Sequence, residues 1–203
     1  MPEDRQLSLF SATIDKSVMN VCHRYMKNPE KIIVSKDEIA LEQLNQYYMI
    51  VNSRNKLEYL LKTMRSQDVQ KAIIFCNTRR NTDWLARKLR ANRYSAEPMH
   101  AGFTQAQRER VTSAFRNGKF DLLIATDVAA RGLDIQGITH IINYDVPVEA
   151  LVYFHRIGRT ARKGGEGTAI TLVGYGEIPD LNKIKTLTKT NIEELEATNP
   201  QYC

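Results

Sequence analysis

The sequence predicts an α/β fold in which helices cover both faces of a parallel sheet. Two kinds of segment alternate from residue 44 onward. Short apolar runs such as KAIIFC (71–76) are typical of strands buried in a parallel sheet. Runs such as TRRNTDWLARKLRA (78–91) carry apolar residues at helical spacing. Because parallel strands need crossover connections, this alternation places helices above and below the sheet.

Six segments are predicted to be the strands of this sheet. The first, LNQYYMIV, is rich in aromatic and β-branched residues, and the later ones are shorter. In chain order, the predicted strands are residues 44–51, 71–76, 95–100, 121–127, 139–145 and 167–173.

Helices are predicted between and after these strands. Apolar side chains recur every three or four positions in residues 55–65, as they do in residues 78–91. The helix predicted at 104–118 has Thr104 as a candidate N-cap and Gly118 just past its end. Further helices are predicted at 149–157, at 177–189 and, in the acidic tail 191–203, up to Pro200.

The first 43 residues are predicted to be a separate piece of structure. An apolar strand is expected at 6–13, a helix at 15–29 and a third short element at 31–35. A segment of this length cannot bury a core of its own. We therefore interpret residues 1–35 as the remnant of a preceding domain, 36–43 as a linker and 44–203 as a second domain.

Composition narrows the class of protein. Of the 203 residues, 42% are hydrophobic, which is enough for one substantial core. The net charge of +6 indicates an anionic partner, although an ordinary basic soluble domain has a similar charge. The three cysteines are far apart and the four histidines lack metal-ligand spacing, so we expect a reducing compartment and no bound metal. We expect neither a signal peptide nor a membrane span.

Three arginines recur every three residues in HRIGRTARKG (155–164), and they are Arg156, Arg159 and Arg162. On one side of a helix they repel each other by about 0.2–0.5 kcal/mol per pair. An arginine that reaches the terminal phosphate of a nucleotide raises the rate of hydrolysis by about 10³ to 10⁵, which outweighs that cost. Gly158 weakens a helix, so its presence indicates close approach of another surface. A solvated basic helix is the alternative interpretation.

Two further motifs contain residue types that bind phosphate. In ATDVAARGLDI (125–135), Thr126 ends an apolar run and Gly132 lets the backbone approach a ligand. Gln105 and Arg108 lie three apart at a helix start, where donors meet phosphate groups. The alternatives are a strand end with a capped short helix, and an exposed polar turn.

Polar side chains also follow the predicted strands where ligands bind to open parallel sheets. Thr78 to Arg80 follow one strand, Thr126 and Asp127 another, and Asp145 a third. We expect threonine, arginine and aspartate side chains to share one edge of the sheet.

Five motifs in this order resemble the second half of the DEAD-box RNA helicases. They are Ser-Ala-Thr (11–13), FCNTR (75–79), QAQR (105–108), ATDVAARGLD (125–134) and HRIGRTAR (155–162). The resemblance covers nearly the whole chain, and TDVAARGLD and HRIGRT are long matches. The segments FCNTRRNTDWL and IALEQLNQYYMIV are most similar to the translation initiation factor four-A branch of that family and its exon-junction relative.

The resemblance implies a RecA-like three-layer domain that forms one side of a cleft. In the family, ATP lies between two RecA-like domains and single-stranded RNA lies across both. Arg159 and Arg162 are then the arginine fingers on the γ-phosphate, His155 assists catalysis, and Asp134 holds the ribose hydroxyls. The residues implied to face or brace the RNA backbone are Asn77, Thr78, Arg79, Gln105, Arg108, Thr126 and Gly132. Those implied to couple the two domains are Ser11, Thr13, His155 and Arg156.

The resemblance also implies partners and a missing half. The chain has neither a G-x-x-x-x-G-K-[ST] loop nor an Asp-Glu-Ala-Asp run. ATP with Mg²⁺ is therefore expected to be held mainly by an amino-terminal RecA-like domain, and this chain alone is expected to be inactive. The implied partners are RNA, that first domain and a helical-repeat scaffold protein, with no membrane and a cytoplasmic location, or a nuclear one in a eukaryote. The alternatives are the second domain of another superfamily-2 motor and a non-catalytic RNA or partner-docking module.

Overall fold

The structure is a computed structural model that describes residues 5–11, 16–32, 44–133, 135–160, 167–188 and 191–196. The chain divides into two compact units, Met1–Ile39 and Ala40–Cys203. No helix in the described residues is both long enough and apolar enough to cross a membrane.

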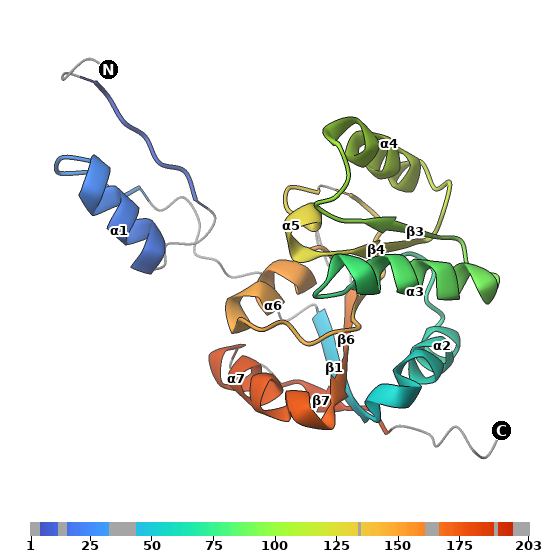
Figure 1. Ribbon diagram of the computed structural model, residues 1–203. Coiled ribbons are helices and arrows are strands. Elements are labelled where there is room, and N and C mark those ends of the chain that lie inside the picture. Colours follow the sequence, from blue (N-terminus) through green and yellow to red (C-terminus); the bar gives the residue numbers. More distant parts are fainter. Residues whose placement is uncertain are drawn as a thin grey trace. The chain divides into compact units, whose positions relative to one another are not determined.

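The second unit is built on a seven-stranded sheet with the order β3-β4-β2-β5-β6-β1-β7, in which every pair of neighbours is parallel (Figure 1). The strands are β1 Leu44–Val51, β2 Ala72–Phe75, β3 Ala96–Met99, β4 Leu122–Ala125, β5 His140–Asn143, β6 Gly167–Gly174 and β7 Glu193–Glu194. The predicted parallel sheet is confirmed, and β1 has the predicted bounds.

Helices cover both faces of this sheet, as predicted. They are α2 Lys56–Ser66, α3 Arg79–Ala91, α4 Gln105–Arg116, α5 Asp127–Ala130, α6 Ala150–Ile157 and α7 Ile178–Thr188. Leu60 of α2 and Leu85 of α3 belong to one buried cluster. Phe115 of α4, Tyr153 of α6 and Leu181 of α7 belong to the other. The unit is therefore a three-layer domain with a separate core on each face of the sheet.

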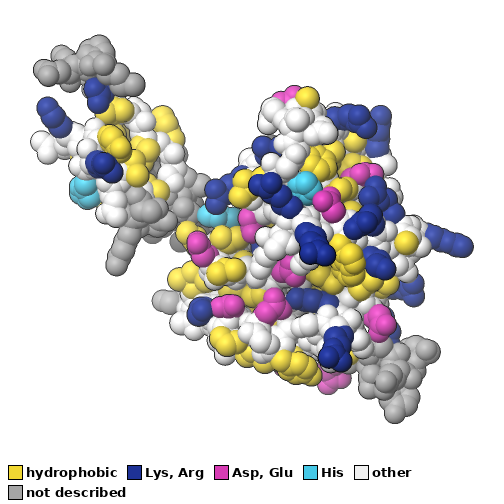
Figure 2. Space-filling model, in the orientation of Figure 1, with side chains coloured by type: hydrophobic (Ala, Val, Ile, Leu, Met, Phe, Trp, Pro, Cys, Tyr) yellow, Lys and Arg dark blue, Asp and Glu magenta, His cyan; other side chains and the backbone are white. Residues whose placement is uncertain are grey.

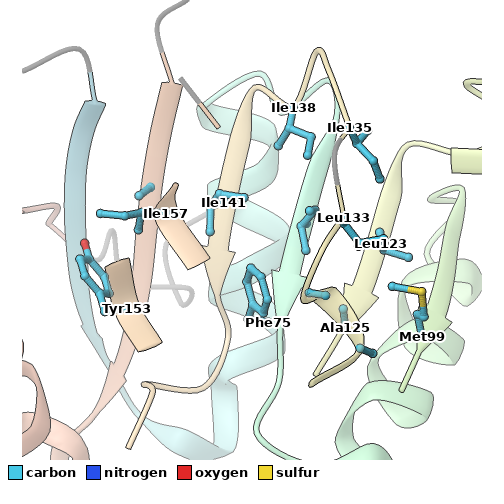
Figure 3. Packing of buried hydrophobic residues seen from close by; sticks show 14 of the residues in the cluster. Phe75, Met99, Leu123, Ala125, Leu133, Ile135, Ile138, Ile141, Tyr153 and Ile157 are labelled. Carbon is cyan, nitrogen blue, oxygen red and sulfur yellow. The ribbon is translucent and has the colours of Figure 1, made fainter. Parts of the chain in front are cut away.

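The alternation of side chains along β2 shows how one strand contributes to both cores. Ile73 and Phe75 point into the cluster under α4, α5, α6 and α7, part of which Figure 3 shows. Ala72 and Ile74 point into the cluster under α2 and α3. All four are at most 1% exposed, and full burial of a large apolar side chain contributes about 1.5–3 kcal/mol. This explains why β2 is apolar throughout.

The helix ends follow the predicted signals. The Thr104 hydroxyl accepts a hydrogen bond from the backbone N–H of Gln107, and the Gln107 side chain accepts one from the N–H of Thr104. This capping box satisfies two N–H groups that an α-helix leaves unpaired. Gly118 lies past the end of α4 with a φ of +68°, a conformation that favours glycine.

The acidic tail differs from its prediction, because its described part contains a strand and no helix. Residues 193–194 pair with β1 as β7, and the N–H of Leu195 donates to the carbonyl of Tyr48 at 2.8 Å. The Tyr48 hydroxyl also donates to Glu194 at 2.7 Å. The unpaired backbone groups of the β1 edge offer more hydrogen bonds than a short helix exposed to solvent does.

The first unit contains one helix among its described residues, α1 Lys16–Tyr25, within the predicted range 15–29. Residues 5–11 form no strand, so this part of the predicted strand at 6–13 is wrong. Phe10 is 93% exposed, and an apolar segment without a neighbouring strand has no ladder to join. Of the third predicted element, residues 31–32 are irregular and the remainder lies outside the described residues.

Candidate functional site

The carboxyl ends of three neighbouring strands bring the predicted polar residues together. Asn77 follows β2, Asp127 follows β4 and Asp145 follows β5, and β2 lies between the other two strands. The backbone N–H of Asn77 donates to Asp145 Oδ2 at 2.9 Å, and the Asn77 amide donates to the carbonyl of Val146 at 2.9 Å. The side chains from motifs far apart in the sequence therefore meet at this edge.

Arg156 is the centre of this arrangement. Its Nε and Nη2 donate to the two carboxylate oxygens of Asp127 at 2.6 and 2.9 Å. Nη2 also donates to Asn77 Oδ1 at 2.8 Å, and Nη1 donates to Asn143 Oδ1 at 3.2 Å and to the Asp145 carbonyl at 2.7 Å. The side chain is 1% exposed. One guanidinium thus joins the ends of β2, β4 and β5 to α6.

Arg156 and Arg159 do not share one side of a helix, in contrast to the prediction. The helix α6 ends at Ile157, and Gly158 is its C-cap with a φ of −66°. Gly158 therefore lies at the end of the helix and does not weaken its interior. The predicted reason for close approach of another surface at Gly158 does not hold. Arg156 points into its own unit, because burial of a guanidinium requires partners for all its N–H groups, and these partners are on neighbouring strands. Its predicted contact with another domain is therefore at most indirect.

Arg159 lies in the turn after α6. Its Nε donates to the carbonyl of His155 at 3.2 Å, and its Nη1 donates to the carbonyl of Leu133 at 3.0 Å. Both bonds are to neutral carbonyls, so the positive charge is not neutralised by them. Leu133 directly precedes Asp134, so Arg159 reaches the segment predicted to hold the ribose.

His155 has an unusual environment. Its Nε2 atom is buried and has no hydrogen-bond partner in the part of the chain that the structure describes. A buried polar atom without a partner costs about 1–3 kcal/mol, so it calls for an explanation. A small hollow of about 20 Å³ lies beside it, lined also by Asp127, Arg131 and Arg159.

The residues predicted to face RNA divide into bracing and accessible groups. Thr78 caps α3 by accepting from the N–H of Asn81 at 3.1 Å, and Asn77 is occupied by the network around Arg156. Arg79 is exposed, and neither its guanidinium nor the Thr126 hydroxyl makes a hydrogen bond to another described residue. Asn77 and Thr78 therefore brace the surface, whereas Arg79 is accessible to a ligand, and Thr126 is 8% exposed with a hydroxyl that is not used within the described chain.

Gly132 and the motif QAQR complete this surface. Gly132 has a φ of +74°, and the space where a side chain would lie is open. Arg108 Nη2 donates to the carbonyl of Ala129 at 3.2 Å, which ties α4 to α5. Gln105 donates to Glu109 at 2.8 Å on the exposed side of α4. The structure thus brings QAQR next to the motif that contains Thr126.

Four of the predicted site residues are not placed at this edge by the structure. Thr13, Asp134 and Arg162 lie outside the described residues. Ser11 belongs to the first unit, where it is exposed.

Asp127 and Asp145 lie at the predicted edge of the sheet, although no individual role was predicted for them, and Asn143 was missed. Asn143 donates to the Thr171 hydroxyl at 3.0 Å while accepting from Arg156. The signal for Asn143 was an asparagine inside the apolar run HIINY. Cys76 lies beside these residues, but burial raises the pKa of its thiol far above the ordinary value, with a smaller contribution from Asp145. The thiol therefore stays protonated and has no nucleophilic role.

The described residues contain no cluster of histidine, cysteine, aspartate and glutamate able to hold a metal ion.

Comparison with known families shows which family the chain belongs to. The family model described as helicase conserved C-terminal domain matches residues 55–164. The chain therefore belongs to the family of helicase carboxy-terminal domains. The match contains the polar edge of the sheet and all of HRIGRTARKG (155–164).

Curated relatives extend the similarity to nearly the whole chain. The ATP-dependent RNA helicase eIF4A of Pyricularia oryzae is 40% identical over 96% of this chain, which covers 50% of that relative. The DEAD-box ATP-dependent RNA helicase CshA of Geobacillus kaustophilus is 40% identical over 97% of this chain, which covers 42% of it. The resemblance to DEAD-box helicases is confirmed, and the chain spans about half the length of these relatives or less.

Solved structures agree with this assignment. A DEAD box protein from Methanococcus jannaschii has a TM-score of 0.72 and 34% identity, and the match covers 92% of this chain and 50% of that one. Dbp5 of S. cerevisiae bound to RNA and ADP BeF3 has a TM-score of 0.85 and 28% identity, covering 98% and 53% of the two chains. The second unit has the RecA-like fold of these proteins.

Proposed function

We propose that this chain is the carboxy-terminal half of an ATP-dependent RNA helicase that requires an amino-terminal RecA-like domain for ATP hydrolysis and duplex unwinding. The observation that carries the proposal is the joining of three helicase motifs by one buried side chain, Arg156. It holds Asn77 and Asp127, so the predicted RNA-facing residues and Arg159 belong to one rigid edge. The coverage of about half of each relative supports a missing half.

For nucleotide hydrolysis, Arg159 and Arg162 are proposed as arginine fingers. Arg159 lies in the turn after α6, beside the segment predicted to hold the ribose, and a guanidinium is a planar donor that binds phosphate oxygens. ATP supplies the phosphoryl group that is transferred, and the residues of this chain orient it and stabilise negative charge. Asp134 would hold the ribose hydroxyls, and Mg²⁺ would be held mainly by the first domain.

Coupling between the two domains is assigned to His155 together with Ser11 and Thr13. The buried Nε2 atom of His155 supports this assignment, because it needs a partner that the described chain does not offer. Arg156 would act indirectly, by fixing the start of α5 and the turn in which Arg159 lies.

For RNA, the exposed residues Arg79 and Gly132, together with the hydroxyl of the largely buried Thr126, are proposed to bind phosphate and sugar groups. A guanidinium, a hydroxyl and an open backbone recognise these groups in any sequence. Binding is then sequence-independent and falls with salt.

Protein partners and location belong to the same proposal. Solved relatives are bound to RraA in the case of SrmB and to Gle1 in the case of Dbp5. We propose that a scaffold protein built of helical repeats docks on this chain. A cytoplasmic location, or a nuclear one in a eukaryote, agrees with the absence of paired cysteines from the sequence.

The test joins this chain to the amino-terminal RecA-like domain of a 40%-identical relative and measures RNA-stimulated ATP turnover. The joined protein is expected to hydrolyse ATP, and this chain alone is expected to show none. Replacing Arg159 and Arg162 with lysine is expected to lower kcat by about 10³-fold or more. Arg65→Lys, on the exposed side of α2, is the matched control. Unchanged turnover in the double variant, or turnover by this chain alone, contradicts the proposal.

A further inference from the structure

A pocket of about 490 Å³ lies outside the site described above. It is enclosed by α2, α3 and the segments that follow β1, β5 and β6, and its walls include Lys56, Arg80, Trp84, Arg87 and Glu177. Its volume is within the range of about 300–1,000 Å³ that small-molecule sites occupy. The resemblance assigns no role to these five residues.

One wall is a face of α3 on which an aromatic ring lies between two arginines. Arg80, Trp84 and Arg87 are spaced at i, i+4 and i+7, so they lie on the same side of the helix. Both arginines are exposed, and neither makes a hydrogen bond or an ion pair to another described residue. Figure 2 shows Lys and Arg side chains gathered over α3. The rim of the pocket is therefore positive.

The floor of the pocket is polar, with one ammonium group between two carboxylates. Lys56 is 6% exposed, and its Nζ atom lies 2.9 Å from Glu177 Oε2 and 3.8 Å from Asp145 Oδ1. The same Nζ atom lies 5.4 Å from the centroid of the Tyr144 ring. Burial raises the pKa of the Tyr144 hydroxyl, which stays neutral. Fixed donors and acceptors beneath a positive, aromatic rim match a flat ligand with polar edges and an attached anion.

The pocket is also next to the proposed RNA surface. Asp145 lines the pocket and accepts from the N–H of Asn77. Arg79, proposed to bind RNA, and Arg80, at the pocket, are consecutive residues in the first turn of α3. Consecutive residues of a helix point about 100° apart, so these two arginines carry positive charge from the sheet edge round to the pocket.

We propose that this pocket binds one nucleotide of single-stranded RNA, in addition to the phosphate and sugar contacts at the sheet edge. The base stacks on Trp84 and presents its edge to Lys56 and Glu177, and the flanking phosphates contact Arg80 and Arg87. Stacking on an aromatic side chain and charge on both sides are the two elements of single-strand binding. This inference rests on the proposed RNA binding of the chain.

Trp84 is the single tryptophan of the sequence, so its fluorescence reports on this pocket alone. The experiment adds a single-stranded RNA of about ten nucleotides, long enough for both surfaces, to the full 203-residue chain. Binding is followed by the anisotropy of a label on the RNA and by tryptophan emission. Both signals are expected to change with the same Kd, and the emission is expected to fall.

Variants separate this inference from the proposed function. The double variant Arg80→Gln, Arg87→Gln is expected to raise Kd by about tenfold, whereas Lys88→Gln, on the same helix outside the pocket, changes it by less than about threefold. Trp84→Phe is expected to keep binding because it retains an aromatic face. Circular dichroism checks that each variant is folded, and all the replaced charges are exposed.

Each remaining outcome contradicts the pocket inference, the proposed function or both. If RNA binds but the emission is unchanged and the double variant behaves as Lys88→Gln does, the pocket inference is wrong and the proposed function stands. If no RNA binds by either signal, both are wrong. If uridine monophosphate changes the emission and the RNA does not, the pocket takes a free nucleotide and the assignment to RNA is wrong.

Discussion

The Arg156 guanidinium forms its hydrogen bonds with groups at the ends of three strands, β2, β4 and β5. Asp127, Asn77, Asn143 and the Asp145 carbonyl would each lose a charged donor without it. A lysine ammonium has the same charge, but it is a single point that cannot reach acceptors arranged around a plane. The planar shape of the side chain, more than its charge, therefore defines this edge.

Arg156→Lys is accordingly expected to lower the free energy of unfolding by about 2–4 kcal/mol, because it leaves buried acceptors without donors. Urea unfolding of the 203-residue chain measures the change. Arg65→Lys, the same replacement on an exposed helix surface, is expected to change it by less than about 0.5 kcal/mol.

A double-mutant cycle with Asp127→Asn tests the pairing itself. The double variant is expected to be little less stable than either single variant, because each change already removes the two-oxygen contact. Additive losses would show that Arg156 and Asp127 do not stabilise the fold through each other.

At the scale of single elements, local pattern and local environment decide how much is predictable. The bounds of β1 follow from LNQYYMIV, and the capping box of α4 follows from Thr104 and Gln107, because each signal lies inside its own element. The tail was mispredicted because β7 exists only through the open edge of β1, which no local pattern reveals. For the same reason spacing alone did not show that α6 ends at Ile157 or that Arg156 points inward.

His140, the first residue of β5, leads to a prediction of how the stability of the fold depends on pH. His140 is 8% exposed, and burial lowers its pKa below the ordinary value of 6.5, with Asp68 opposing the shift. The unfolded chain therefore binds a proton on this residue at a pH where the folded chain does not. The stabilising effect is complete above about pH 6.5 and is lost as the pH falls through the folded-state value.

Urea midpoints between about pH 7.5 and 5.5 check this prediction. The unmodified chain is expected to lose more stability over this interval than His140→Gln, whose side chain does not titrate. If the two proteins lose stability in parallel, protonation of His140 is not coupled to unfolding.

At the scale of the whole molecule, the structure shows where some of the cations behind the net charge of +6 are grouped. Exposed cations of α3 border both the sheet edge, at Arg79, and the pocket, at Arg80 and Arg87. A surface of this kind attracts a polyanion along its length and gives little preference among bases. The sequence alone predicted an anionic partner, and the fold shows which cations are grouped.

The consequence is a salt-dependent affinity for RNA that is nearly the same for different sequences. Each phosphate contact on a single strand contributes about −0.7 to the slope of log K against log salt concentration, so three to five contacts give about −2 to −4. Arg79→Gln is expected to make the slope shallower by about 0.7, because its exposed guanidinium is proposed to contact a phosphate and nothing else in the described chain competes for it. Anisotropy titrations of oligouridylate and oligoadenylate at several salt concentrations supply both quantities.

A slope near zero, or affinities for the two RNAs that differ by more than about tenfold, would mean that base edges rather than phosphates dominate recognition. The binding surface would then have to be sought away from the cations of α3.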